Sequence, residues 1–222
     1  VEAMVARAEG SKPPKPKEAV LFEAGGVAGL SRIAQRLGLL DLIDAQAPKR
    51  DQGPRVGHYI VLAALNRALA PCSKLAIGDW YEQTVLRRLW RFEKSAFSSQ
   101  RFWDHMSMVS EEAIETIQTE LAARVRREFG LDAEVLLYDT TNFFTFLATS
   151  NDRCTVAQRG HSKAKRHDLR QVGLALLVTR DFQVPLFHKV YDGNVHDVSL
   201  FPSLAKELVA RHIHFQGPRA RK

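Results

Sequence analysis

Asp139 is the residue of this sequence whose type and setting most clearly suggest chemistry. It follows the run Glu134-Val-Leu-Leu-Tyr138, which is short, rich in β-forming residues and preceded by Gly130. Such a run is typical of a buried strand, so we expect Asp139 to be buried at the end of that strand. A buried carboxylate is costly unless it is paired, hydrogen-bonded or bound to a metal ion. The alternatives are an aspartate that begins a turn and a strand end that is partly solvated.

A basic segment, residues 153–170, is the second candidate. It joins the Asp139 strand to the next expected strand, so phosphates held by its cations would lie near Asp139. An acid that binds Mg²⁺ through oxygen, beside cations that hold a nucleic-acid backbone, suits phosphodiester chemistry. The alternative is a solvated charged loop. Its only acid is Asp168, and His161 and His167 lie between its cations. The six cations are Arg153, Arg159, Lys163, Lys165, Arg166 and Arg170.

The number of these cations sets an expectation for binding. If all six neutralise phosphates, the slope of log K against log salt concentration should be about −5. A formal net charge of +7 and an isoelectric point near 9.6 also favour a polyanionic partner.

Other possible ligands carry less weight. The sequence YDGNVHD supplies Asp192, Asn194, His196 and Asp197, whose side chains include metal-ligand types. Asp-Gly-Asn is also turn chemistry, and Asp197 is placed to cap or precede a helix, which we favour. The P-loop, dinucleotide-binding, nucleophile-elbow and zincin motifs are all missing from the sequence. Cys72 and Cys154 lie far apart without a C-x-x-C pair, so a zinc site or disulfide framework is not indicated.

The first 130 residues are expected to be helical. Residues 1–20 include SKPPKPK and are expected to form a flexible basic arm. Apolar spacing predicts helices over 27–45, interrupted at Gly38, and over 56–70, ended by Pro71. Shorter helices should follow, and a longer one should run from the Ser110 N-cap to Phe129 and stop at Gly130. Trp80, Trp90 and Trp103 are expected to be core anchors.

The pattern changes at residue 131. Strands are predicted over 134–140, with TNFFTF as a candidate extension, and over 171–179 and 184–191. The short link RDFQ predicts an antiparallel hairpin of the last two. A helix should follow from about Ser199 to Arg211. The expected fold class is α/β: a helical region, 21–130, then a domain over 131–222 with three antiparallel strands and a helix.

Three segments together resemble a known family. They are YDTTNFFTF, RGHSKAKRHDLRQVGLALLVT and VPLFHKVYDGNVHD, across about residues 134–200. In order and spacing they resemble bacterial insertion-sequence transposases of the DDE type, in the insertion-sequence-four-like superfamily. NRALAPCSKLAIGDW is similar to that family's helical region.

The resemblance implies DNA transposition by an RNase H-like domain. Asp139 would be the first of three acids, Asp, Asp and Glu, that bind two Mg²⁺ ions for strand cleavage and transfer. It also implies DNA contacts by the helical region, insertion-sequence ends and target DNA as partners, and a dimer or an assembly with intact transposase. A bacterial cytoplasmic, nucleoid-associated protein is expected. For the basic segment it implies DNA contacts by Arg159, His161, Lys163, Lys165, Arg166 and Arg170.

One departure limits the expected activity. The family's second Asp and its Glu would follow the helix that ends near Arg211, and the sequence reaches Lys222 without them. We therefore expect the chain to be inactive alone, as the product of a truncated, frameshifted or split gene. Two alternatives stay open: a non-catalytic DNA-binding protein that inhibits transposition, and an unstable remnant whose sheet has an open edge.

Overall fold

The chain combines helices with a three-stranded antiparallel sheet, as the sequence predicts. It divides into two compact units, Val1–Ile114 and Glu115–Lys222, each described by itself below. This division falls inside a helix that the sequence pattern groups with the first region. The computed structural model describes residues 22–48, 52–131, 136–147, 151, 153–160, 168–196, 199–202 and 204–207. The arm expected over residues 1–20 lies outside these ranges.

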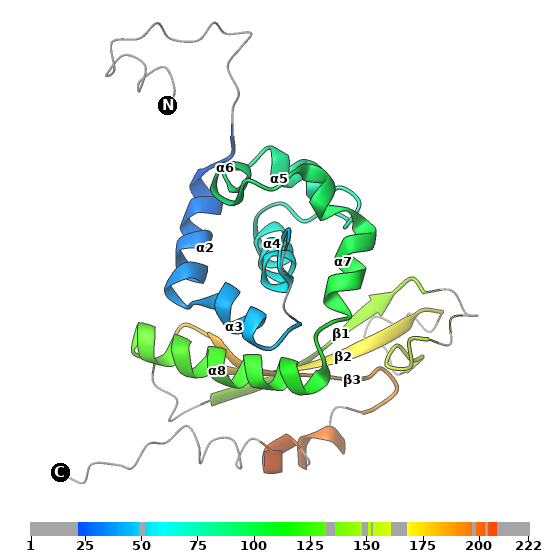
Figure 1. Ribbon diagram of the computed structural model, residues 1–222. Helices are drawn as coiled ribbons and strands as arrows, with labels where there is room; N and C mark the ends of the chain where they lie inside the picture. Colours follow the sequence, from blue (N-terminus) through cyan, green and yellow to red (C-terminus); the bar gives the residue numbers. More distant parts are fainter. Residues whose placement is uncertain are drawn as a thin grey trace, which may run out of the picture. The chain divides into compact units, whose positions relative to one another are not determined.

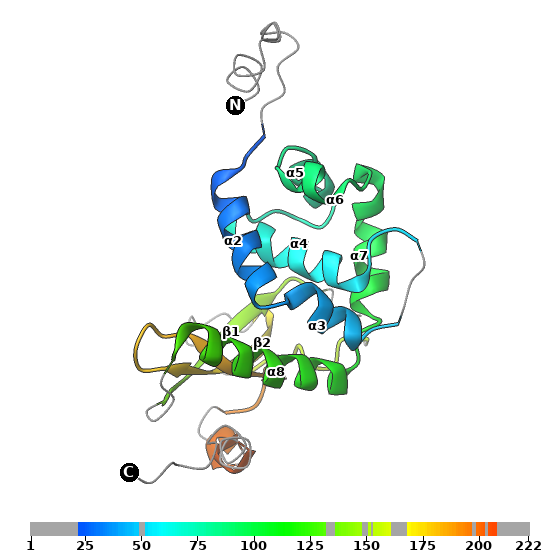
Figure 2. The same cartoon turned by 60° about the vertical axis from the view of Figure 1, so that its left-hand side comes forward.

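The first unit is built around one central helix. Helix α4 contacts α2, α3, α5 and α7, and it runs through the middle of the ring that the other helices form (Figures 1 and 2). Apart from an isolated bridge between Glu23 and Thr84, the described residues of this unit are helical or irregular. The elements are α2 (Gly25–Arg36), α3 (Leu39–Ala45), α4 (Val56–Leu69), α5 (Ile77–Glu82), α6 (Leu86–Trp90), the 3₁₀ helix η1 (Lys94–Phe97) and α7 (Ser99–Met106).

The helix boundaries lie where the sequence predicts them. Gly38 separates α2 from α3 with a φ of 59°, a left-handed conformation that glycine adopts without steric cost. Helix α4 ends at Leu69, shortly before Pro71. Helices α2 and α3, on either side of Gly38, both contact α4.

An aromatic cluster forms the core of the first unit, with Phe97 at its centre. Phe97 is 1% exposed, and its ring centroid lies 4.6 Å from that of Tyr81 and 5.4 Å from that of Tyr59. Three further rings lie within 6.4 Å of it, those of Trp90, Phe92 and Phe102. Trp80 and Trp90 are half-buried, but Trp103 is 58% exposed, so its prediction as a core anchor is wrong.

The second unit contains the sheet and α8 from Glu115 onward. Helix α8 (Glu111–Phe129) begins after Ser110, whose Oγ accepts a hydrogen bond from the Ala113 N–H at 3.2 Å, and ends before Gly130, as predicted. Strands β1 (Leu136–Thr145), β2 (Arg170–Thr179) and β3 (Pro185–Asp192) are ordered β1-β2-β3, antiparallel throughout. Residues 199–202 and 204–207 are helical, and the rest of the helix predicted to Arg211 lies outside the described residues.

The helical residues after β3 cover one face of the sheet. Leu204 packs into a buried cluster with Ala175, Phe187 and Tyr191. On the same face the ring of Tyr191 lies over Gly173, where a Cβ atom would come within 2.2 Å of the ring. Helix α8 also reaches the sheet, because Ala122 packs with Leu186. Among the described residues, no helix combines the length and apolarity that crossing a membrane requires.

The Phe97→Ala variant tests the aromatic core. Truncation of so buried a ring removes contacts to five others, so we expect the free energy of unfolding to fall by about 3–5 kcal/mol. Chemical denaturation followed by tryptophan fluorescence measures it. Leu75→Ala is the control, since Leu75 is 81% exposed and its loss should change stability little. Equal effects of the two changes would contradict the assigned core.

His58 makes the stability of this unit depend on pH. Burial lowers the His58 pKa below its ordinary 6.5, although Asp44 opposes the shift, and the rings of Trp90 and Phe92 lie edge-on at 5.1 Å. The unfolded chain therefore binds a proton at this site more readily than the folded chain does. The free energy of unfolding should fall as the pH drops below about 6.5.

The matched measurement compares the wild-type protein with His58→Gln. Thermal melts between about pH 5 and pH 7 should show a weaker pH dependence in the variant, because glutamine does not titrate. Parallel curves for the two proteins would show that His58 does not carry the effect.

Candidate nucleic-acid interface

Asp139 is exposed and lies near the middle of β1, so the expectation of a buried residue at a strand end is wrong. The strand continues through Thr145, because the Thr and Phe residues after Asp139 suit an extended backbone. Side chains alternate between the two faces of a strand, which puts Asp139 on the face of Leu137 and Phe143. Those two are 44% and 55% exposed, so this face of β1 is accessible to solvent.

The neighbours of Asp139 do not complete a metal site. Across the sheet, Asp139 pairs with Leu176, and Leu176 pairs with His188. His188 is thus two strand spacings away, about 10 Å, which is too far to share one ion with Asp139. Burial lowers the pKa of His188, and its backbone N–H donates to Gln118 Oε1 at 2.7 Å.

The described ranges hold no group of three His, Cys, Asp or Glu side chains that could bind a metal ion. A single exposed carboxylate does not fit the two Mg²⁺ ions that the family resemblance implies. We therefore derive no cleavage step from these residues.

The basic segment meets the sheet at the corner where β2 begins and β3 ends. Gln158 and Gln171 exchange two backbone hydrogen bonds, of 3.0 and 2.8 Å. The Gly193 N–H donates to the Val156 carbonyl at 3.1 Å, and Gln171 Nε2 donates to the Gly193 carbonyl at 2.7 Å. Residues 156–160 and 192–194, distant in the sequence, therefore lie side by side.

Two glycines allow this approach of the backbones. A Cβ atom on Gly193 would lie 1.9 Å from the Gln171 carbonyl oxygen, and one on Gly160 would lie 2.0 Å from the Gly193 oxygen. Neither distance is possible for a real side chain, and the atoms met are backbone atoms that have little freedom to move. Both positions therefore require glycine because of space, not because of a left-handed backbone.

The corner holds two of the predicted DNA contacts in defined positions. Arg159 is exposed next to the paired Gln158. Arg170 is half-buried, and its Nη1 donates to the Asn151 carbonyl at 2.7 Å, so it also anchors the start of the segment. Arg153 is exposed, and its N–H donates to Asn151 Oδ1 at 3.1 Å. The other predicted contacts, His161, Lys163, Lys165 and Arg166, lie outside the described residues.

The DGN segment forms the turn that the sequence predicts. The Val195 N–H donates to the Asp192 carbonyl at 3.0 Å, and Asp192 is exposed at the end of β3. His196 precedes the following helical residues, and its carbonyl accepts from the Ser199 N–H at 3.0 Å. Asp197 lies outside the described residues.

Sequence reasoning missed the residues that connect the segments. Gln158 and Gln171 carry the pairing, and their only signal is that each stands close to a conspicuous motif. It also missed Arg87, Arg88 and Arg91 of the first unit, whose signal is the cluster LRRLWR.

The comparisons with known proteins add no identification. Neither a protein-family model, a curated protein nor a solved structure matches the chain.

The Gly193→Ala variant tests the corner. The new methyl group would collide with the Gln171 carbonyl, so the strand ends must separate. We expect amide hydrogen exchange at Gln158 and Gln171 to accelerate by at least about tenfold, because their shared hydrogen bonds break. Gly29→Ala is the control, since a Cβ atom there meets nothing within 4 Å. Unchanged protection in the Gly193 variant would contradict the close approach.

Proposed function

We propose that the chain binds DNA as part of a DDE-type transposase of the insertion-sequence-four-like superfamily. The proposal joins the resemblance of three sequence segments with the arrangement of two of them at one corner of the sheet. An antiparallel order β1-β2-β3 followed by helical residues supports an RNase H-like domain, the finer part of this proposal.

The observation that carries the proposal is that Arg159 lies on a segment whose backbone is fixed by hydrogen bonds. Backbone hydrogen bonds at Val156 and Gln158 hold the segment against the DGN turn and β2, while Arg159 stays exposed. A cation held on a rigid support binds phosphate with little loss of conformational entropy. Because a guanidinium donates through a planar fork that matches phosphate oxygens, an arginine at this corner suits a DNA backbone.

Asp139 has a limited role in this proposal. It would contribute one metal-binding carboxylate on β1, which lies at an edge of the described sheet. The other acids would have to come from outside the described residues. The proposal for this chain is therefore DNA binding, and catalysis would require those further ligands.

A DNA-binding protein without catalysis is the second candidate function. The observation that favours it is the lack of a three-ligand metal group within the described ranges. Incubation of supercoiled plasmid and Mg²⁺ with the chain and a polypeptide that supplies the missing acids separates the two, because only the transposase function predicts metal-dependent nicking there.

The test is a salt titration of DNA binding by fluorescence anisotropy with the full chain in EDTA. Arg159→Ala should weaken binding several-fold and reduce the salt slope by about 0.9, since one phosphate contact is lost. The matched control is Arg180→Ala. Arg180 is exposed and paired with Asp181 in the turn at the other end of β2, so its loss should leave affinity unchanged.

Asp139→Asn serves as a second comparison in the same assay. Its binding in EDTA should equal the wild-type value, because Asp139 pairs with Leu176, five residues along β2 from the corner at Gln171. A wild-type chain that shows no salt-dependent DNA binding would overturn the proposed function.

A further inference from the structure

The first unit carries an exposed tryptophan beside a cation. Trp103 lies on α7 and is 58% exposed, whereas Trp80 and Trp90 are half-buried. The Nζ atom of Lys74 lies 4.3 Å from the centroid of the Trp103 ring, in cation–π geometry. The pair therefore offers a ligand both an aromatic surface and a positive charge.

Helix α7 holds Trp103 on a rigid support. Phe102, the residue before it, is fully buried, and its ring centroid lies 5.2 Å from that of Tyr59. His105 is also buried and stacks on the Tyr59 ring, with 3.8 Å between the centroids. Because Phe102 and His105 anchor α7 in the aromatic core, the helix is fixed while Trp103 remains exposed to solvent.

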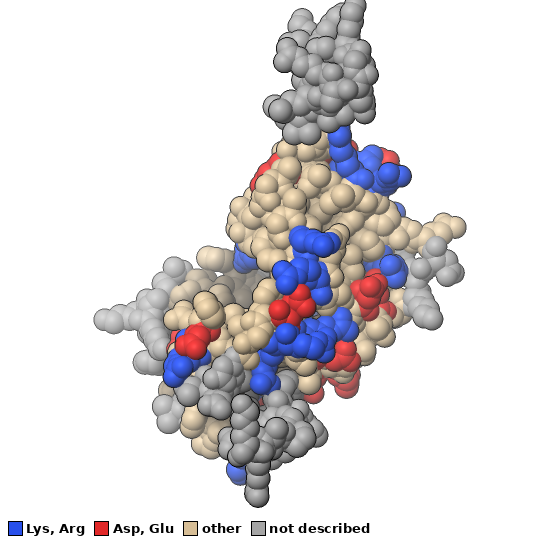
Figure 3. Space-filling model, turned by 90° about the vertical axis from the view of Figure 1, so that its left-hand side faces the viewer, with Lys and Arg blue, Asp and Glu red and all other residues tan. Residues whose placement is uncertain are grey.

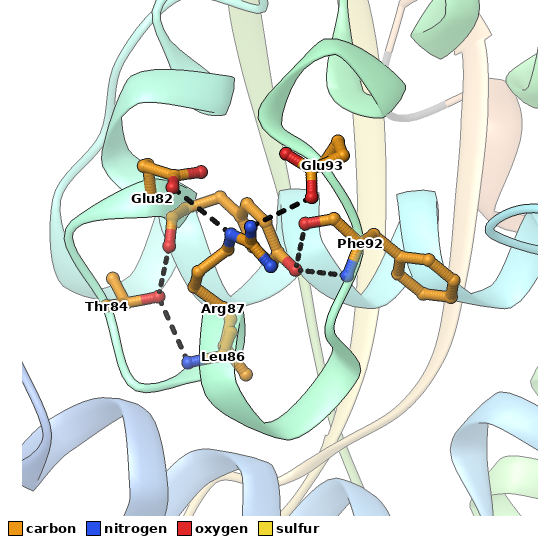
Figure 4. Close-up of polar contacts among 7 residues, drawn as sticks. Glu82, Thr84, Leu86, Arg87, Phe92 and Glu93 are labelled. Atoms are coloured by element: carbon orange, nitrogen blue, oxygen red, sulfur yellow. Dashed lines mark hydrogen bonds and ion pairs between the residues drawn. The ribbon is translucent and has the colours of Figure 1, made fainter.

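The link that leads into α7 is also fixed, by a polar network after α5. Arg87 Nε pairs with Glu82 Oε1 at 3.1 Å, and Arg87 Nη2 pairs with Glu93 Oε1 at 3.0 Å (Figure 4). The Tyr81 hydroxyl meets both the N–H and the carbonyl of Phe92 at 3.2 Å. These contacts hold the chain between α6 and η1, from which α7 follows directly.

The ring distinguishes this surface better than its charge does. Figure 3 shows the side on which Figure 1 places α2, and Lys and Arg side chains lie there too, next to Asp and Glu side chains. Helix α7 itself has one acid, Asp104, which accepts a hydrogen bond from Gln100 Nε2 at 2.8 Å. Attraction to phosphate is therefore spread over the chain, while an exposed indole on a fixed helix is particular to α7 among its tryptophans.

We propose that Trp103 stacks on an unpaired base of DNA, with Lys74 beside the adjoining phosphate. The inference rests on the proposed function and adds a contact in the first unit. An indole stacks on any base, because every base has a π-face, and lysine supplies the charge that attracts the backbone. In a duplex those faces are covered by neighbouring bases, so the ligand of this site is single-stranded DNA.

The experiment measures binding of the full chain to fluorescent oligothymidylate in EDTA across a salt series. Trp103→Ala should weaken binding by about tenfold, since one stacked base is lost. Its salt slope should equal that of the wild type, because stacking neutralises no phosphate. Lys74→Ala should instead make the slope less steep by about 0.7, the value for one phosphate of a single strand.

Two further substitutions at the same position distinguish stacking from simple apolar contact. Trp103→Phe keeps an aromatic face and should recover most of the affinity. Trp103→Leu keeps apolar volume without that face and should bind as weakly as Trp103→Ala. Leu89→Ala is the matched control, since Leu89 is 55% exposed on a different helix, and its affinity should be that of the wild type. Because these side chains are exposed, all variants should melt within a few degrees of the wild type.

A blunt DNA duplex of the same length separates this inference from the proposed function. Trp103→Ala should bind the duplex as the wild type does, because its bases are already stacked. If the wild-type chain binds DNA and Trp103→Ala binds single strands equally well, the stacking contact is wrong and the proposed function stands. If the wild-type chain binds neither form of DNA, both fall. Equal losses on duplex and single strand, or wild-type affinity in Trp103→Leu, would also overturn the stacking assignment.

Discussion

The close approach of backbones at Gly193 is the constraint on which the candidate interface depends. A side chain there would collide with the Gln171 carbonyl, and one on Gly160 would collide with Gly193 itself. With both glycines present, Gln158 pairs with Gln171 and the basic segment becomes an extension of the sheet corner. Without that approach, the cations of 153–160 would sit on an unanchored loop. The corner thus turns a charge run, whose usual interpretation is a solvated loop, into a surface with a defined position.

Each of the two units has an exposed arginine beside a segment that backbone hydrogen bonds hold in place. At the sheet corner, backbone bonds around Gln158 hold Arg159 in place; in the first unit, the bridge between Glu23 and Thr84 holds the segment of Phe22, on whose ring Arg88 rests. In each case backbone hydrogen bonds hold the segment beside the cation in place. Arg170 and Arg87 both contact other parts of the protein, Arg170 through the Asn151 carbonyl and Arg87 through two glutamates. The structural cations support the exposed ones.

The sequence pattern of β1 alone does not decide whether Asp139 is buried or exposed. The β1 sequence has apolar residues on both faces, Tyr138 on one and Leu137 and Phe143 on the other, so alternation alone does not say which face is covered. The helical residues after β3 settle it, because Phe201 packs on Tyr138 at 5.4 Å and leaves the Asp139 face exposed. An exposed carboxylate on an edge strand needs no metal ion to be stable. A catalytic role for Asp139 would require acids from outside the described residues.

The sequence by itself determined the helical first region, the break at Gly38, the three antiparallel strands and the excess of positive charge. Each of these depends on residues a few positions apart: apolar spacing, helix-ending glycine and proline, and short links between β-forming runs. Only the tertiary structure decided the exposure of Asp139 and Trp103, the meeting of 156–160 with the DGN turn, and the gathering of Phe22 with the α6 arginines. Those features depend on contacts between distant segments, where packing and steric fit, rather than local preference, select the arrangement.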